Sequence, residues 1–383
     1  MSDWDVIVVG AGNAALAAAV SAREQGAGRV LALEKAPRAL RGGNTHYSGG
    51  LLRIAFDRPD DLRPLVPDAE REVPGFYAGV EPYPHRLFMA DLLRVTDGRT
   101  DPELAELLIG RSHDTACWMA RQGIEMEPAV SLSAVKVGDT YKWSPGAVIR
   151  ARHEGVGLSA MWFKIAEREG VEVRYDTAAE RLLQDRSGRV TGVAARGPNG
   201  LEELSARAVV LGCGGFEANP EWRARYLGRP WDQAKVRGTR YNTGDGLRMA
   251  MEVGALPHGQ WTGCHSTPID ADAPPHGDRK LTDKTNRLSY PYGVQVNTRG
   301  HRFFDGFGNV TRRHRNAVAG EQLLALVLEQ IQRLLLGCVR ETYGADTRRS
   351  SSASSQSVMV SRGEPGVNTS ATPWRLSSSE SGP

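Results

Sequence analysis

The chain has few of the features that mark secreted, metal-binding or nucleic-acid-binding proteins. Its 383 residues include four cysteines, Cys117, Cys213, Cys264 and Cys338, which lie far apart without a C-x-x-C pair or a metal-ligand spacing. This pattern predicts no disulfide framework and no metal site, and it suits a reducing cytoplasm. The formal net charge of +3 is small for this length, so it gives no reason to expect a nucleic-acid partner.

Long apolar runs are also scarce. The stretch from Val6 to Val20 is broken by a glycine turn, and no basic region precedes it, so we expect neither a signal peptide nor a membrane span there. The leucine-rich stretch 322–336 contains Glu329 and Arg333, which make it a poor span. With 40% hydrophobic and 24% charged residues, the chain can bury a large core and is expected to form two domains.

Glycine, by contrast, is abundant and gathers first behind an apolar strand. Val6 to Val9 lead into Gly10, Gly12 and Ala15, the G-x-G-x-x-G/A turn that opens a dinucleotide-binding unit. Here Gly10 permits a tight turn, Gly12 lets a pyrophosphate approach, and Ala15 allows the helix to pack on the strand. A second strand, 29–33, ends in Glu34, where a carboxylate accepts ribose hydroxyls and disfavours a 2′-phosphate. This fingerprint does not distinguish an NAD-binding site from an FAD-binding site.

A second glycine cluster, Arg41 to Gly50, follows directly. Its glycines permit positive φ and close approach to a ligand, and its Asn, Thr and Ser side chains provide short hydrogen-bonding groups. A flavin extends further than a nicotinamide and needs this second cradle, so the cluster favours FAD; an ordinary surface loop is the alternative. The two clusters predict cofactor contacts from Gly10, Gly12, Asn13, Ala14, Ala15, Glu34, Lys35, Gly42, Gly43, Asn44, Thr45, Ser48, Gly49 and Gly50.

The rest of the pattern is mixed α/β. Helices are expected over 87–96, 102–122 and 159–168, the second with Asp101 as N-cap, Gly123 as C-cap and a buried stripe. That stripe is predicted to contain Leu104, Leu107, Leu108, Thr115, Trp118 and Met119. Period-two segments at 171–175, 189–195 and 206–211, with Gly188 and Gly200 in the turns, predict a strand meander. We therefore expect a Rossmann-like FAD-binding domain with a β-meander insertion.

As an ordered set, these segments resemble the fumarate reductase/succinate dehydrogenase flavoprotein family. The matching strings are G-A-G-N-A-A, L-E-K, G-G-N-T, L-G-C-G-G-F-E-A-N-P, T-G-D-G and V-N-T-R-G-H-R-F, which cover residues 1 to about 305. Within the family, strings such as H-E-G-V-G-L-S and V-R-G-T-R-Y-N-T-G-D-G are most similar to FAD-dependent tricarballylate dehydrogenases. The resemblance implies further flavin contacts from Ala178, Gly214, Gly215 and Asp245. It also implies non-covalent FAD, because the spacing of His46 does not match the family's His-linked motif.

The resemblance implies oxidation or reduction of a carbon–carbon bond beside a carboxylate, with tricarballylate and cis-aconitate as favoured substrate and product. His265 stands where relatives carry a substrate-binding His, although a structural His is the alternative. The family's proton-shuttling Arg is missing before Val296, which leaves Tyr290 or Tyr292 as a possible base if they do not merely pack. Arg240 and His153 are the next candidates for binding carboxylates.

Other outcomes stay open from the sequence. Arg223, Arg225 and Lys235 are expected on a solvated face. Two alternatives to polycarboxylate oxidation remain. The chain could dehydrogenate a 3-ketosteroid, which would require an apolar capping domain, or it could be a flavin-domain fragment without enzymatic turnover. An electron-accepting iron–sulfur membrane protein is the partner that the resemblance implies, with the chain cytoplasmic and peripheral to the membrane.

The expected division is a FAD-binding domain over 1–262, a partial capping domain over 263–305 and an atypical tail over 306–383. The family's acidic residue after Asp305 is Gly306 here, and Ser, Gly, Pro, Arg and Thr dominate from Arg348 to Pro383. This composition predicts a disordered tail. A shifted reading frame or a truncated gene would explain it, with little turnover expected, and a lineage-specific partner-binding tail is the alternative.

Overall fold

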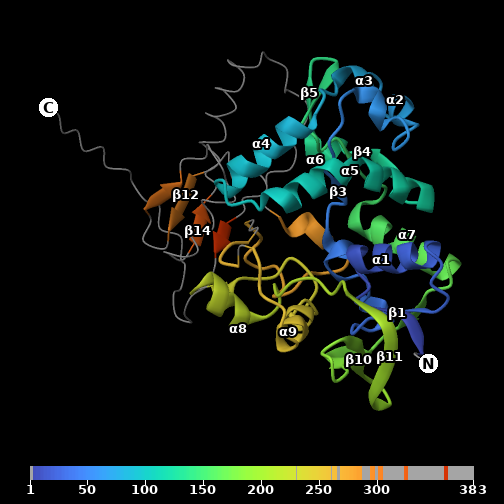
Figure 1. Cartoon of the computed structure of the whole chain (residues 1–383). Coiled ribbons are helices and arrows are strands. Elements are labelled where there is room, and N and C mark those ends of the chain that lie inside the picture. Colours follow the sequence, from blue (N-terminus) through green and yellow to red (C-terminus); the bar gives the residue numbers. More distant parts are fainter. Residues whose placement is uncertain are drawn as a thin grey trace.

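A six-stranded sheet forms the base of the protein (Figure 1). The computed structural model describes residues 3–229, 231–259, 261–264, 268–286, 294–297, 301–304, 323–326 and 358–360. Of these, 294–297, 303–304, 323–326 and 358–360 are described as backbone only. The strand order is β8 (Glu172–Arg174), β2 (Val30–Leu33), β1 (Trp4–Val9), β11 (Gly200–Leu211), β10 (Val190–Gly197) and β9 (Ala178–Gln184). The first four strands pair in parallel, whereas β9, β10 and β11 pair antiparallel. A meander inside a Rossmann-like sheet is thus confirmed, but its members differ from the prediction. The segment 171–175 contributes β8 at the opposite edge of the sheet, and the third meander strand is β9, which was not predicted.

The centre of the sheet is buried on both faces, because β2 and the second half of β1 are apolar at every position. Val8 and Ala32 face the helices, whereas Ile7 and Leu33 face the meander and α9 (Asp245–Glu252). Successive side chains of a strand point to opposite faces, so an unbroken apolar run suits a strand that is covered on both sides. On the helical side, α1 (Asn13–Glu24) packs between the sheet and α7 (Glu154–Arg168).

A helical layer lies beyond α7, built from α4 (His85–Thr96) and α5 (Pro102–Gln122) with the short helices α2 (Ala69–Glu72), α3 (Phe76–Gly79) and α6 (Val130–Ser133) (Figure 1). A three-stranded sheet joins β3 (Leu51–Leu52), β7 (Ile149–Ala151) and β4 (Met126–Pro128), and β5 (Ala134–Val137) forms a hairpin with β6 (Thr140–Trp143). The strand β3 directly follows the second glycine cluster, so this layer fixes the end of that loop.

Helix α5 has the predicted ends but only part of the predicted buried face. The Asp101 carboxylate accepts from the Leu104 backbone N–H (3.0 Å), and Gly123 ends the helix with φ 109°. However, Leu104, Leu107 and Leu108 are 57%, 59% and 58% exposed. The buried positions are Ala105, Ile109, Ala116 and Met119, and Trp118 packs against the core. The prediction was therefore right for Trp118 and Met119 and wrong for the three leucines and Thr115, because a second stripe with Ala105, Ile109 and Ala116 packs on the core instead.

Helix α7 begins five residues earlier than predicted, at Glu154, and Gly155 in its first turn packs against the second cluster. After α9 and the short α8 (Pro220–Trp222), four strands form a separate sheet in the order β13 (Arg302–Phe304), β12 (Val294–Asn297), β14 (Leu323–Leu326) and β15 (Val358–Val360). Most of the predicted tail, 306–383, lies outside the described residues.

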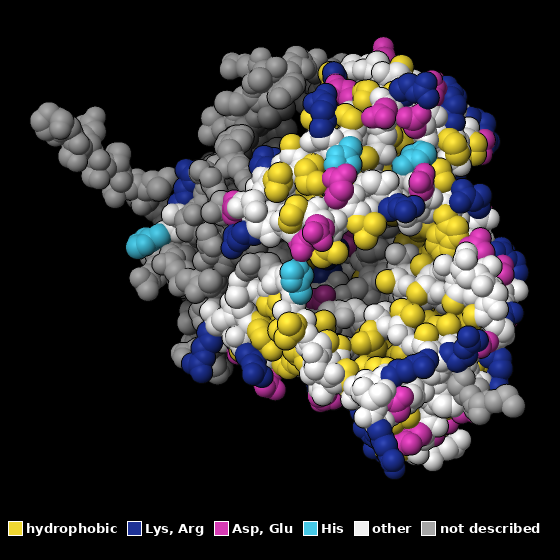
Figure 2. All heavy atoms as spheres, in the orientation of Figure 1, with side chains coloured by type: hydrophobic (Ala, Val, Ile, Leu, Met, Phe, Trp, Pro, Cys, Tyr) yellow, Lys and Arg dark blue, Asp and Glu magenta, His cyan; other side chains and the backbone are white. Residues whose placement is uncertain are grey.

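The visible surface carries both charge signs (Figure 2). Lys and Arg side chains alternate with Asp and Glu over the face shown, with apolar groups between them. Among the described residues, no helix combines the length and the apolar character needed to cross a bilayer. Nor do these residues contain a group of three or more His, Cys, Asp or Glu that could bind a metal ion.

Candidate flavin-binding site

The first glycine cluster forms a tight turn between β1 and α1. Gly10 adopts φ 106°, and its N–H donates to the Leu33 carbonyl oxygen (2.7 Å). A Cβ at Gly10 would lie 2.7 Å from the Gly212 carbonyl oxygen, so only glycine fits. Gly12 is the N-cap of α1 in an extended conformation and offers no side chain to the first-turn amides. The positive end of the helix therefore faces the crevice at the carboxyl ends of the strands, where a pyrophosphate would bind.

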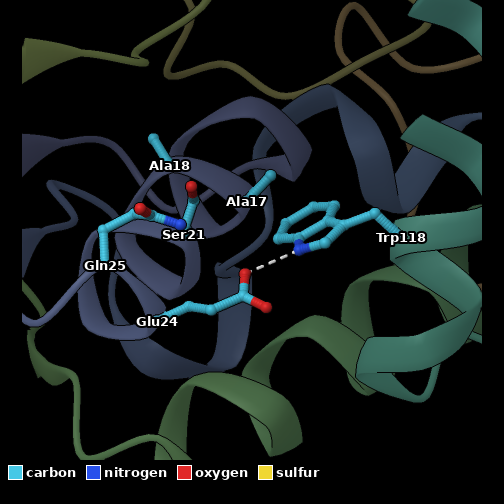
Figure 3. A pocket seen from close by; sticks show the side chains of 6 residues that line it. All are labelled: Ala17, Ala18, Ser21, Glu24, Gln25 and Trp118. Carbon is cyan, nitrogen blue, oxygen red and sulfur yellow. Dashed lines mark hydrogen bonds between the residues drawn. The ribbon is translucent and has the colours of Figure 1, made fainter. Parts of the chain in front are cut away.

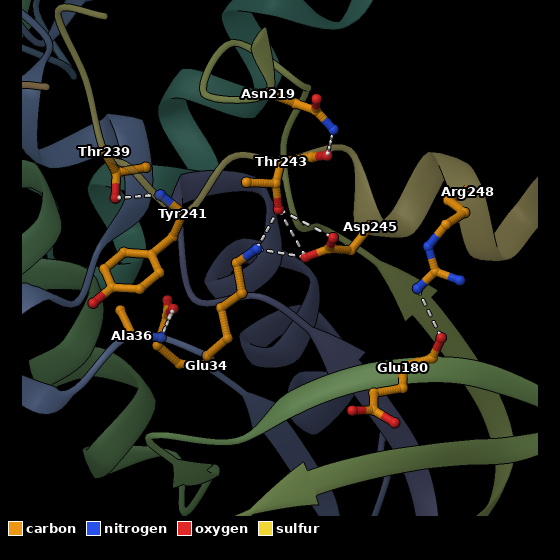
Figure 4. A network of polar contacts seen from close by, with 10 residues as sticks. Glu34, Ala36, Glu180, Asn219, Thr239, Tyr241, Thr243, Asp245 and Arg248 are labelled. Carbon is orange, nitrogen blue, oxygen red and sulfur yellow. Dashed lines mark hydrogen bonds and ion pairs between the residues drawn. The ribbon is translucent and has the colours of Figure 1, made fainter. Parts of the chain in front are cut away.

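Glu34 ends β2 as a buried carboxylate, 6% exposed. Its Oε1 accepts from the Ala36 N–H (2.8 Å), and within the described part of the chain it forms no ion pair (Figure 4). Burial raises the pKa of Glu34, against the lowering effect of that backbone hydrogen bond and of Lys35. A buried carboxylate without a cationic partner is costly to keep ionised. The hydroxyls of a ribose would supply the donors that this carboxylate lacks, so the residue fits an adenosine.

The second cluster is held by α7. Its first glycine, Gly42, has φ 100°, and a Cβ there would lie 2.3 Å from Ser159 Oγ. At the N-terminus of α7 a Cβ on Gly155 would lie 2.0 Å from the Thr45 carbonyl oxygen, and the Gly155 N–H donates to the Ser48 carbonyl oxygen (2.8 Å). The loop and the helix therefore touch backbone to backbone, which only glycines allow.

Two hydrogen bonds tie this loop and helix to the first turn. Thr45 Oγ1 accepts from the backbone N–H of Asn13 (2.8 Å). The indole N–H of Trp162, a fully buried residue of α7, donates to Asn13 Oδ1 (2.6 Å). The two glycine clusters are thus parts of one cradle.

A third part of the cradle comes from the T-G-D-G motif. Lys35, which follows Glu34, forms an ion pair with Asp245 and donates to Thr243 Oγ1 (2.6 Å), so the end of β2 is tied to the start of α9 (Figure 4). Nearby, the Thr177 N–H donates to the Glu34 carbonyl oxygen (3.0 Å), which places Ala178 at the same edge. The Gly244 N–H donates to the Gly215 carbonyl oxygen (3.0 Å), and Gly214 adopts φ 77° beside it.

The segment 268–286 packs on the outer side of the second cluster. The Arg279 guanidinium donates to His46 Nδ1 (3.1 Å) and to the Arg41 carbonyl oxygen (3.0 Å). Burial, and then the Arg279 charge, lowers the pKa of His46, so its ring is neutral at pH 7. Because this ring is buried and bonded to Arg279, its surroundings agree with the expectation of a flavin that is not attached through His46.

The predicted catalytic residues fall in three groups. His265, Tyr290 and Tyr292 lie outside the described residues, so their predictions remain untested. Arg240 is exposed near the second cluster, on the segment whose Thr239 N–H donates to Asn44 Oδ1 (2.9 Å). His153 is exposed at the N-cap of α7 with φ 60°.

One expectation about charged residues was wrong. Arg223 was expected on a solvated face, but it is 8% exposed. Its guanidinium donates to the carbonyl oxygens of Glu217, Trp231, Asp232 and Ala234. Burial lowers the pKa of Arg223. The side chain therefore organises the loop 217–234 from within, because one guanidinium has enough donors to satisfy several carbonyls that cannot reach water.

Several residues of the site were not predicted, namely Ser159, Trp162 and Arg279. The H-E-G-V-G-L-S string gave a usable signal for the α7 residues, because two glycines at a helix start indicate close backbone contact. No local signal marked Arg279, since it contacts Arg41 and His46, which lie more than 230 residues away in the sequence. Arg237 flanks the T-G-D-G motif, as Arg240 does, but the sequence favoured Arg240.

A hollow of about 500 Å³ lies elsewhere (Figure 3). It is lined by Ala17, Ala18, Ser21, Glu24 and Gln25 of α1 and by Trp118 of α5, whose indole N–H donates to Glu24 Oε2 (2.8 Å). None of the cradle residues lines it. The flavin site is therefore assigned from the glycine geometry and the buried carboxylate rather than from this hollow.

The geometry defines an α/β protein with a dinucleotide cradle extended by a second glycine loop. A family model described as "FAD binding domain" matches residues 5–325, and the chain belongs to this family. The cofactor prediction of FAD is confirmed at this level.

Individual relatives are more distant. The chain is 26% identical over 265 residues to fumarate reductase (cytochrome) of Shewanella frigidimarina, which covers 69% of this chain and 42% of the relative. It is 28% identical over 323 residues to 3-oxosteroid 1-dehydrogenase of Mycobacterium tuberculosis, which covers 67% of this chain and 55% of the relative. The chain thus spans about half or less of the curated relatives' lengths.

A solved structure supports the fold. The open conformation of a flavocytochrome c3 fumarate reductase superposes with a TM-score of 0.62 at 22% identity, covering 89% of this chain and 55% of that one. At this identity the likeness shows the α/β flavoprotein fold alone, which agrees with the predicted fold class.

Proposed function

We propose that the chain is the flavin-binding part of an FAD-dependent oxidoreductase that acts on a carbon–carbon bond next to a carboxylate. The observation that carries this proposal is the continuous cradle in which Asn13 joins the first turn, the second glycine loop and α7. The relative named fumarate reductase acts, by its name, on such a bond, whereas the relative named 3-oxosteroid 1-dehydrogenase acts on a ketone.

Bound FAD would supply hydride-accepting chemistry, and the chain's own residues would bind and orient it. Glu34 would accept the ribose hydroxyls, and the start of α1 would stabilise the pyrophosphate charge. The loop 42–50, fixed by Gly155 and Trp162, would hold the ring portion against movement. Arg240 and His265 are proposed to bind substrate, and Tyr290 or Tyr292 to move the proton.

The finer proposal is that the substrate is a small polycarboxylate, with tricarballylate oxidised to cis-aconitate. It is supported by the tricarballylate-type strings and by the cations of the segments 235–240 and 276–280, which lie against the second glycine cluster. Electrons would leave to a separate iron–sulfur membrane protein, which would place the chain peripherally at the inner face of a membrane.

An acceptor-linked assay of the FAD-reconstituted chain tests the proposal with tricarballylate, succinate and a neutral 3-ketosteroid as parallel substrates. Reduction of an artificial acceptor with tricarballylate is the expected result. Turnover of the ketosteroid alone would replace the polycarboxylate proposal with the steroid alternative. Flavin reduction by each substrate under anaerobic conditions is measured alongside, because this single turnover needs no electron acceptor.

A further inference from the structure

Arg237 differs from the other half-buried arginines near the cradle. It makes no hydrogen bond and no ion pair with any residue that the structure describes. The comparable guanidiniums are all satisfied: Arg41 by Tyr175, Arg150 by Glu127 and Glu154, Arg152 by Glu72, Arg223 by four carbonyls and Arg279 by His46. A cation removed from water without a partner is costly, so an unpaired guanidinium in this position requires an explanation.

The backbone fixes Arg237 beside the second glycine cluster. The Val236 N–H donates to the Pro275 carbonyl oxygen (2.9 Å), and the Gly277 N–H donates to the Gly238 carbonyl oxygen (2.8 Å). A Cβ on Gly238 would lie 2.3 Å from Asn44 Oδ1, so this segment touches the loop directly. Arg237 therefore sits on a rigid segment, bonded on both sides, at the border of the proposed flavin site.

The electrostatic surroundings favour an anion at this place. Burial lowers the pKa of Arg237, and the Asp283 charge opposes that shift without forming an ion pair. The Asp283 carboxylate itself lies next to the cluster, since a Cβ on Gly49 would be 3.4 Å from its Oδ2. A second anion bound to the guanidinium would offset its desolvation, and attraction between charges is stronger where water is partly excluded.

The other cations of this region are weaker candidates. Arg240 is exposed, where water screens its charge. Burial, followed by the charges of Arg240 and Arg223, lowers the pKa of His276, which leaves its imidazole neutral at pH 7. A planar guanidinium can in addition bind both oxygens of a carboxylate at once.

We propose that Arg237, rather than the exposed Arg240, is the principal residue that binds a carboxylate group of the substrate. This inference rests on the proposed function, because it places the carboxylate beside the flavin loop. It replaces the order of preference from the sequence, which favoured His265, Arg240 and His153 as substrate-binding residues.

The test compares three variants of the full chain reconstituted with FAD: Arg237→Met, Arg240→Met and, as a matched control, Arg225→Met at an exposed position. Calorimetric titration gives the affinity for tricarballylate, and flavin fluorescence gives the affinity for FAD. Arg237→Met is expected to weaken tricarballylate binding by about 30-fold or more, as expected when one partner of a buried charge pair is removed. FAD affinity should stay at the wild-type value, the unfolding temperature should not fall because an unfavourable buried charge is removed, and the control should bind tricarballylate normally.

The possible outcomes separate the two proposals. Wild-type tricarballylate affinity in Arg237→Met would overturn the role of Arg237 while leaving the proposed function intact. Binding of a neutral 3-ketosteroid, but not of tricarballylate, by the unmutated chain would overturn both the polycarboxylate substrate and the role of Arg237. If Arg237→Met does not fold, Arg237→Lys decides: it keeps the charge but not the two-point geometry, so affinity equal to wild type would refute the inference.

Discussion

Replacing Glu34 by Gln should weaken FAD binding while leaving the cofactor-free chain at least as stable. The carboxylate is buried at the end of β2, with the Ala36 N–H bonded to one oxygen and no ion pair to a described cation. Hydrogen bonds to a charged group contribute roughly 1.5–3 kcal/mol each, so loss of the charge should reduce FAD affinity by about 10- to 150-fold.

The stability of the cofactor-free chain should change in the opposite direction. Because burial raises the pKa of Glu34, the carboxyl group favours folding below its ordinary pKa, and this contribution is lost as the pH rises through the folded-state value. At pH 7 the ionised group therefore opposes folding, and Glu34→Gln removes that opposition. The advantage of the variant should disappear as the pH approaches 4, where the group is protonated in both states.

The assay titrates the cofactor-free chain with FAD and follows quenching of flavin fluorescence, with thermal unfolding measured at pH 4 to 8. Glu203→Gln, which alters an exposed carboxylate paired with Arg181 on the meander, is the matched control and should retain FAD affinity. Unchanged FAD affinity in Glu34→Gln would refute the assignment of this carboxylate to the ribose, whatever happens to stability.

Three further perturbations follow from the same geometry. Gly12→Ala should leave the cofactor-free fold intact, because its Cβ would lie 3.5 Å from Thr45 Oγ1 in ordinary contact. It should abolish FAD binding by occupying the space that the pyrophosphate approaches, and FAD affinity equal to that of the unmutated chain in a titration would disprove this close approach. Gly155→Ala should lower the free energy of unfolding by roughly 1–3 kcal/mol through overpacking, whereas Gly110→Ala, in an open helical position, should raise it by about 0.5–1 kcal/mol. Urea unfolding measures both, and similar changes in the two variants would contradict the packing argument. The pKa of His46 is lowered, so the contribution of the neutral ring to stability is present above the ordinary pKa of 6.5 and is lost as the pH falls through the folded-state pKa. The unfolding temperature of His46→Gln, measured between pH 4 and 8, should therefore fall less on acidification than that of the unmutated chain.

The elements of the cradle could be predicted because their signals are local. An apolar run followed by Gly10 and Gly12 implies a strand, a tight turn and a helix start, and each of these is set by backbone sterics within a few residues. The same holds for the ends of α5, where Asp101 and Gly123 act on neighbouring backbone groups. Part of the buried face of that helix was missed because Leu104 and Ile109 are both apolar, and the choice between them depends on what packs against the helix.

What joins the cradle was decided only by the tertiary structure. Trp162 reaches Asn13 across 149 positions, and Arg279 reaches His46 across 233, so neither contact leaves a trace in the spacing of nearby residues. The burial of charged side chains depends on tertiary structure for the same reason. Arg223 and Arg225 are alike in sequence, yet Arg223 is buried among carbonyl oxygens and Arg225 is exposed. The sequence by itself determined the turns, the strand pattern and the kind of cofactor, since backbone conformation and ligand-approach glycines are local properties. Only the folded chain decides which distant segments exclude water. The burial of Glu34, the hydrogen bonds of Arg223 and the lack of a partner for Arg237 among the described residues all depend on this.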